Sequence, residues 1–212
     1  SRPSRAGAEA EVVTSEAAAL PMESRPEPRR GAKLLPDGVM GMLLFVFTEA
    51  MLFAGLISAH TIVKSRAAGQ MWPPFGQPRL PLGETAVNTA ALLISGIVLV
   101  FAHYAFRKEA GRALVPLGIS VLLGAFFVVF QGVEWAALLS EGLTLTSSSY
   151  GSFFYLMIGT HAAHAIAAIA CLAWAWLRLR RGRLTASQFG TVQVFWYFVV
   201  LVWPVLYLKV YL

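Results

Sequence analysis

Long stretches without a charged side chain occupy most of this chain. Four of them contain no Lys, Arg, Asp or Glu at all, namely residues 85–106, 113–133, 142–177 and 184–208. A fifth stretch, residues 38–63, contains a single charge, Glu49. Each stretch supplies the roughly 20 apolar residues that a helix needs to cross a bilayer core. The pattern therefore predicts an all-α polytopic membrane protein with a bundle of five transmembrane helices.

A transmembrane β-barrel is the competing architecture. Its strands would show about 10 residues of alternating apolar and polar character, whereas these stretches are continuously apolar. A helix also satisfies its backbone hydrogen bonds within one segment, as lipid requires. We therefore expect helices over about residues 37–63, 84–106, 113–139, 149–177 and 190–211.

The polar N-terminal segment differs from the rest of the chain. Residues 1–36 are rich in Ala, Glu, Arg, Pro and Ser and contain few large apolar side chains. Such a composition cannot build a core, so we expect a flexible cytoplasmic tail, followed by a transmembrane domain over residues 37–212. Because the first apolar stretch begins only after this tail, no secretory signal peptide is expected.

Composition supports the membrane class. Hydrophobic residues make up 57% of the chain and charged residues only 13%, against roughly 25% charged in soluble proteins. The net charge of +6 follows topology and does not indicate nucleic-acid binding. Thirteen Lys and Arg residues lie in the tail and in connections 107–112 and 178–183, and four lie on the opposite side. This bias places the N-terminus in the cytoplasm and the C-terminus outside.

Five ionisable residues interrupt the apolar stretches, and such groups at membrane depth are costly and usually functional. They are Glu49, His103, Glu134, His161 and His164. Glu49 and His161 each lie 12 residues into their expected helices, which corresponds to a depth of roughly 18 Å at 1.5 Å per residue. His161 and His164 are three apart and share one helix face. We therefore predict that Glu49 pairs with His161 or His164 across a helix interface.

Three roles are open for these groups: interior polar residues with hydrogen-bond partners, participants in proton movement, or ligands of a metal or haem. Ligation is the least favoured, because protein metal sites usually take three or more ligands and the chain has four histidines and one cysteine, Cys171. Gln131 and Glu134, also three apart, are either an interfacial polar pair or a contact to a partner subunit or lipid headgroup. Small residues at helical spacing, Gly159, Ala163, Ala167 and Ala170, predict a face for close helix packing.

Five motifs, in order along residues 38–212, resemble subunit III of the haem-copper terminal oxidases. "FVFTEAMLFAGLISAH" resembles that family's "F..SE.MFF" helix, and "LPLGETAVNTAALLISG" resembles its "P..NT..LL.SG" segment. "LGAFFVVFQGVEW" resembles "LG..F...Q..EY", and "YGSFFYLMIGTHAAH" resembles "YGS.FF..TG.HG.HV". "FWYFVVLVWPVLY" resembles "YWHFVDVVW..LY". The chain looks like the short, five-helix bacterial form of that subunit.

The resemblance implies a non-catalytic core subunit of a proton-pumping oxidase that reduces O2 to water with electrons from cytochrome c or quinol. It implies no cofactor on this chain, haem and copper on the partner subunits I and II, bound phospholipid, and a bacterial inner membrane. Glu49, His161 and His164 map to family residues that pack the bundle and support proton uptake. Structural, lipid or partner contacts are expected for six further residues: Asn88, His103, Gln131, Glu134, Trp196 and Tyr197.

The last motif departs from the family pattern, because Tyr197 and Val200 stand where the family has His and Asp. A homologue associated with nitric oxide reductase is therefore an alternative. A stand-alone membrane cytochrome or transporter is another. The catalytic subunit of these oxidases needs more histidines than the four in this chain, and the copper-binding subunit needs paired cysteines where this chain has one.

Overall fold

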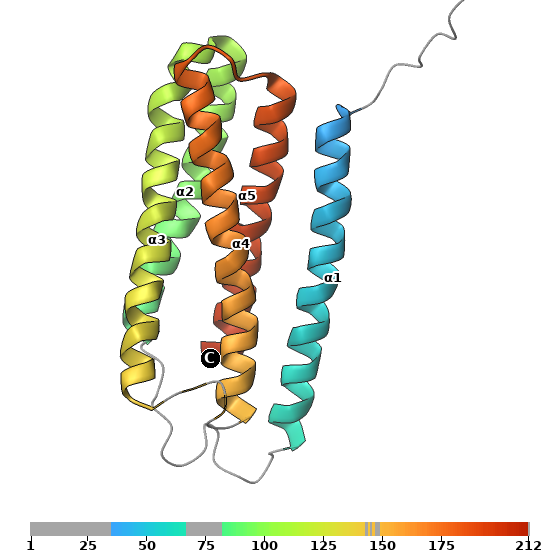
Figure 1. The fold of residues 1–212 in the computed structure, drawn as a ribbon, viewed down its shortest axis with the longest axis vertical. Helices are drawn as coiled ribbons and strands as arrows, with labels where there is room; N and C mark the ends of the chain where they lie inside the picture. Colours follow the sequence, from blue (N-terminus) through green and yellow to red (C-terminus); the bar gives the residue numbers. More distant parts are fainter. Residues whose placement is uncertain (1–34, 67–81, 143, 145, 147–148, 212) are drawn as a thin grey trace, which may run out of the picture. The chain divides into compact units, whose positions relative to one another are not determined.

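The computed structural model describes residues 35–66, 82–142, 144, 146 and 149–211. The described part contains the long helices α1 (Asp37–Arg66), α2 (Leu82–Lys108), α3 (Leu114–Ser140), α4 (Ser149–Arg180) and α5 (Ala186–Leu206) (Figure 1). A 3-10 turn, η1 (Ala110–Ala113), joins α2 to α3, and a π-helical turn, η2 (Tyr207–Tyr211), follows α5. All five long helices are apolar and long enough to cross a membrane, which confirms the predicted fold class. The expected tail, residues 1–36, lies outside the described residues except for its last two positions.

Local capping explains two of the helix ends that differ from the prediction. Helix α5 begins at Ala186, four residues early, since Thr185 forms a capping box with Gln188: each side chain accepts a hydrogen bond from the other residue's backbone N–H. Helix α4 continues to Arg180 and ends in a Schellman motif, in which the N–H of Arg183 donates to the carbonyl of Arg178 at 2.9 Å. Gly182, with φ of +64°, supplies the left-handed residue that this motif requires.

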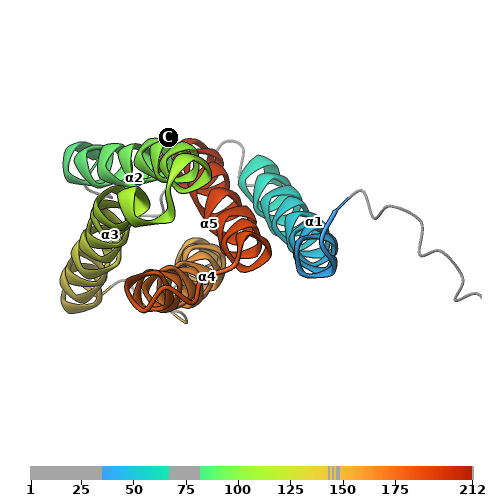
Figure 2. The same ribbon diagram turned by 90° about the horizontal axis from the view of Figure 1, so that it is seen from above.

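Helices α2 to α5 form a four-helix bundle in which each helix packs on its neighbours and α5 returns to α2. Helix α1 lies beside α5 and touches α4 to a lesser extent, as the view from above shows (Figure 2). Only Phe53 and His60 of α1 are buried, and large apolar side chains such as Phe47 and Met51 are more than 60% exposed. In a bilayer such a surface needs no protein cover, because lipid tails are as apolar as the side chains themselves.

The bundle packs around two tryptophans of α5, Trp196 and Trp203, both fully buried. Trp196 lies against Gly124 of α3: a Cβ on that glycine would be 2.6 Å from Trp196 Cη2. Trp203 packs edge-on against Phe127 of α3, with ring centroids 4.9 Å apart. The two indole rings of α5 thus fill the space in front of α3, and Gly124 leaves room for one of them.

The predicted small-residue face of α4 is wrong. Ala163, Ala167 and Ala170 are exposed, and the alanines that pack inward are Ala165 and Ala168. The spacing of the four predicted residues does place them on one face of a helix. Because α4 has small residues on several faces, however, their presence does not identify the face that packs against a neighbouring helix.

Candidate functional site

A carboxylate and a histidine join α1 to α4 inside the membrane-spanning region. Glu49 Oε2 lies 3.0 Å from His164 Nε2, and both side chains are less than one-fifth exposed. The sequence left His161 and His164 as alternative partners of Glu49, and the structure places His164 there. On the other side of the ring, His164 Nδ1 lies 2.8 Å from the backbone carbonyl of Thr160.

These two contacts limit where the hydrogens of the pair can lie. A carbonyl oxygen only accepts hydrogen bonds, so Nδ1 of His164 must bear a hydrogen. One further proton then occupies the contact between Nε2 and the Glu49 carboxylate. The pair is an imidazolium with a carboxylate or a neutral imidazole with a carboxylic acid, and it is neutral overall in both arrangements. Overall neutrality lowers the cost of placing these groups at membrane depth.

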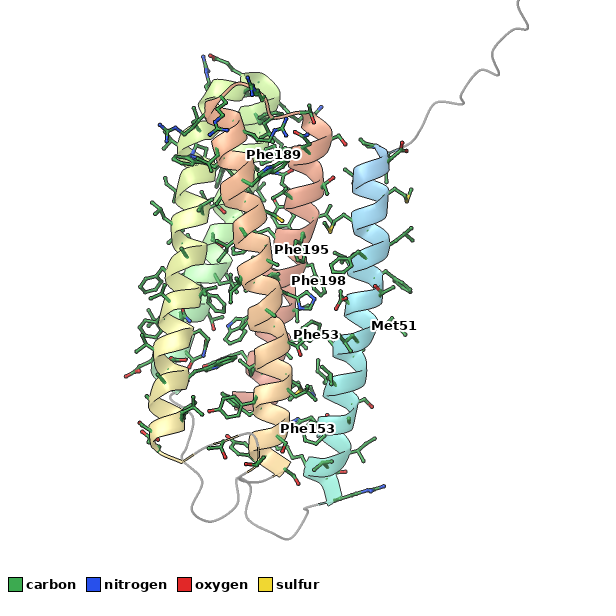
Figure 3. The ribbon with its side chains drawn as sticks, in the orientation of Figure 1. Met51, Phe53, Phe153, Phe189, Phe195 and Phe198 are labelled. Carbon is green, nitrogen blue, oxygen red and sulfur yellow. The ribbon has the colours of Figure 1, made fainter. Side chains whose placement is uncertain are left out.

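Aromatic rings surround the Glu49–His164 pair. The His164 ring lies within 6.4 Å, centroid to centroid, of Phe45 and Phe53 of α1 and of Phe195 and Phe198 of α5. Figure 3 shows Phe53, Phe195 and Phe198 together in the space between α1 and the bundle. These rings give the His164 end of the pair a mostly apolar surrounding.

His161 lies three residues earlier on α4 and has different surroundings. Its side chain is 1% exposed and lies in tilted contact with Trp203 at 5.0 Å between centroids. Phe53 and Phe127 contact its ring edge-on at 6.3 Å. Phe53 therefore touches both histidines, but His161 does not contact Glu49, and its Nε2 has no hydrogen-bond partner among the described residues.

A second polar cluster lies between α2 and α3 and centres on Glu134. Its carboxylate accepts a hydrogen bond from Thr85 Oγ1 at 3.1 Å and another from Gln131 Nε2 at 2.8 Å. Asn88 Nδ2 donates to the backbone carbonyl of Phe127 at 3.2 Å and lies 3.4 Å from Gln131 Oε1. All four polar side chains are at most 5% exposed. The Gln131–Glu134 pair, which the sequence left as interfacial or as a contact to lipid or a partner, is enclosed within the bundle.

The remaining predicted residues lie on α2 and α5. His103 Nδ1 contacts Gln193 Oε1 at 2.9 Å, which ties the end of α2 to the start of α5. Trp196 is buried and donates from Nε1 to Ser95 Oγ at 3.2 Å. Tyr197 is partly buried and lines an apolar groove between α1 and α5. The structure thus gathers the predicted residues into several separate contacts between helices.

Sequence reasoning missed several partners of these residues. Thr85 and Gln193 complete the contacts of Glu134 and His103, and Trp203 Nε1 donates to Thr89 Oγ1 at 2.8 Å. One signal was available: Thr85, Asn88 and Thr89 recur at the i, i+3, i+4 spacing of one helix face in an otherwise apolar helix. A polar face on a membrane helix indicates that this face meets protein and not lipid.

Among the residues described, no group of three or more His, Cys, Asp or Glu side chains comes close enough to hold a metal ion. The polar groups instead form pairs and clusters between helices. The fold and these contacts define the class: a polytopic membrane protein whose intramembrane polar residues bind its helices to one another.

Comparison with known proteins identifies the family. The sequence model of "Cytochrome c oxidase subunit III" matches residues 31–212. Cytochrome c oxidase subunit 3 of Coturnix japonica and that of Gallus gallus are each 32% identical over 182 residues, covering 81% of this chain and 67% of the relative. Subunit 3 of Lycodon semicarinatus is 34% identical over the same length. The chain belongs to the cytochrome c oxidase subunit III family, and it is a non-catalytic subunit of a haem-copper terminal oxidase.

This membership has two consequences. The chain takes part in respiratory electron transport as part of the oxidase complex, and subunit III carries no redox centre of its own. The comparisons do not favour the alternatives of a nitric-oxide-reductase-associated homologue or a stand-alone cytochrome or transporter.

Proposed function

We propose that this chain packs beside subunits I and II of its oxidase, which hold the haem and copper, in a bacterial plasma membrane with the N-terminus in the cytoplasm. The charge asymmetry supports the orientation. Connections 107–112 and 178–183 supply seven basic residues. The first connection includes η1 and the second is the α4–α5 turn, and both lie at the same end of the helices (Figure 1). Positively charged connections favour the cytoplasmic side.

The Glu49–His164 contact supports a role in proton supply. It lies at membrane depth beside aromatic rings, and it joins α4 to α1, the least buried of the five helices. We propose that this pair fixes α1 to α4 and that its proton takes part in sustaining proton uptake by the neighbouring catalytic subunit.

Two apolar grooves beside α1 support a role in binding phospholipid. One has a volume of about 560 Å³ and is lined by residues of α1, α4 and α5, including Met42, Trp174 and Phe195. The other has a volume of about 450 Å³ and lies between α1 and α5 along Phe53 and Leu201. Grooves of this size and apolar character suit lipid acyl chains, which would fill the space that α1 leaves open.

The test uses the whole oxidase with Glu49→Gln and Glu49→Ala in this chain. Glutamine keeps a polar group against His164 Nε2 but cannot give up a proton, and alanine removes both functions. Proton uptake and turnover are measured in proteoliposomes, and retention of the subunit is measured after purification. The matched control is Glu84→Gln, because Glu84 is exposed at the start of α2.

The two variants separate the proposed roles. If the proton matters, both variants slow proton uptake relative to Glu84→Gln while Glu49→Gln stays assembled. If the pair only fastens α1, Glu49→Ala loses the subunit and Glu49→Gln behaves like wild type, which contradicts the proton role. Unchanged behaviour of both variants contradicts both roles.

A further inference from the structure

A cavity lies between α3 and α4. Its volume is about 160 Å³, and Trp203 of α5 lies at its inner side with His161. Residues of α3 and α4 form its walls, among them Gln131, Trp135 and Ile158. Gly132 and Ile166 also line it and are exposed, so the cavity reaches the outer surface of the bundle. A Cβ on Gly132 would meet nothing within 4 Å, which shows the open space there.

Two residues of the cavity lining, His161 and Trp135, each carry a side-chain nitrogen without a partner. His161 Nε2 and Trp135 Nε1 are buried, and neither makes a hydrogen bond to any residue that the structure describes. His161 is 1% exposed, so its ring reaches no solvent on another side. A buried polar atom without a partner destabilises the fold, and native structures almost always satisfy such atoms with protein or with water.

We propose that this cavity is a binding site for internal water. The water accepts a hydrogen bond from the indole N–H of Trp135 and hydrogen-bonds to Nε2 of His161. The space suffices, because a site of about 15 Å³ is enough for one water molecule, and an internal water needs two to four polar partners. Trp135 and His161 supply two of them.

An acyl chain is the competing occupant, since most of the lining is apolar. A hydrocarbon would leave both nitrogens unsatisfied, whereas water satisfies both. The grooves beside α1 differ in this respect, because no unpartnered buried side-chain nitrogen lies among the residues that line the groove at Phe53 and Leu201. The two kinds of cavity should therefore take different occupants.

Water in this cavity would extend the polar cluster between α2 and α3 as far as α4. Gln131 belongs to the cluster through its hydrogen bond to Glu134, and it also lines the cavity. The polar contacts would then run from Thr85 through Glu134 and Gln131 to the cavity and His161. His161 would be positioned by water, whereas His164 is positioned by Glu49 and the Thr160 carbonyl.

The first test is a map of the intact oxidase at a resolution that shows ordered water, with a parallel crystal under xenon pressure. We expect water density within hydrogen-bond distance of Trp135 Nε1 and His161 Nε2, and no xenon there. Xenon enters dry apolar cavities, and xenon bound elsewhere in the same crystal confirms its delivery. Elongated acyl density, or xenon in the α3–α4 cavity, overturns the proposal.

The second test uses Ala162→Leu, which extends a cavity-lining residue into the space. If the leucine displaces water, it leaves the two nitrogens without a hydrogen-bond partner and lowers the melting temperature of the complex. The same substitution in a Trp135→Phe background should lower the melting temperature less, because the indole nitrogen is absent and only His161 Nε2 loses a partner. A rise in melting temperature, as expected for filling a dry void, overturns the proposal. An equal fall in both backgrounds, as expected for simple overpacking, overturns it as well.

Discussion

Substitution of Gly124 should lower the stability of the bundle, because the neighbours of this glycine leave no room for a side chain. A Cβ at this position would lie 2.6 Å from Cη2 and 2.8 Å from Cζ2 of Trp196, and 3.3 Å from Cγ1 of Ile169. The Trp196 ring cannot simply move aside, since it is fully buried and its Nε1 donates to Ser95 Oγ. The Gly124→Ala substitution must therefore push α3 away from α5 or displace the ring.

The expected cost follows from these two routes. Inserting one extra carbon into a packed core typically costs about 1–3 kcal/mol. Displacing the Trp196 ring also weakens its hydrogen bond to Ser95, which is worth about 1 kcal/mol. A gain of at most about 1 kcal/mol from replacing glycine in a helix offsets part of this. We expect Gly124→Ala to destabilise the bundle by about 1–3 kcal/mol.

Gly132→Ala is the matched control on the same helix, because a Cβ there meets nothing within 4 Å. Both variants are compared in the detergent-solubilised oxidase by thermal denaturation and by retention of this chain in the complex. Gly124→Ala should denature at a lower temperature than wild type, and Gly132→Ala should denature at the wild-type temperature or slightly above it, because it gains helix propensity without a clash. Equal stability of the two variants would refute the close packing of Gly124 on Trp196.

Three further substitutions test individual contacts by thermal denaturation of the same complex. Thr185→Ala removes the N-terminal cap of α5 and should cost about 1 kcal/mol; no loss would contradict the capping box. Trp203→Phe removes the hydrogen bond to Thr89 and replaces a fully buried indole with a smaller ring, so it should cost more than the roughly 1 kcal/mol of the hydrogen bond alone, and Thr89→Val should add little in that background. Glu134→Leu strands the donors that its carboxylate now satisfies and should destabilise more than Glu134→Gln, which keeps an acceptor oxygen. The reverse order would show that these donors find other partners.

Much of the candidate site could be anticipated from the sequence, but only as a set of residues. Glu49, His161, His164 and Glu134 stood out because a titratable group in an apolar helix is costly and needs a reason to be there. Their partners were harder to predict. Gln193 is uncharged and nothing in the sequence marked it as the partner of His103, while the spacing of Thr85 with Asn88 and Thr89 marked a polar face but did not identify Glu134 as its partner.

The choice between the two histidines shows where sequence reasoning stopped. Three residues along a helix separate side chains by about 60° around its axis, so His161 and His164 share a broad face. That difference decides their surroundings: His164 faces α1 and meets Glu49, while His161 faces α3 and α5 and lies on Trp203 and Phe127. Equal depth was a correct reason to expect a partner for Glu49, but rotation about the helix axis selected which one.

The sequence by itself determined that the chain forms five membrane-spanning helices, because lipid forces every backbone group to be satisfied within a segment and the charge-free stretches have the required length. Only the tertiary structure decided which face of each helix lies inside. In water, the apolar face marks the core, but here most helix faces are apolar, so apart from a polar face such as that of Thr85, Asn88 and Thr89 hydrophobicity does not indicate which face lies inside. Shape complementarity, such as Gly124 against Trp196, and a few hydrogen bonds between helices make that choice.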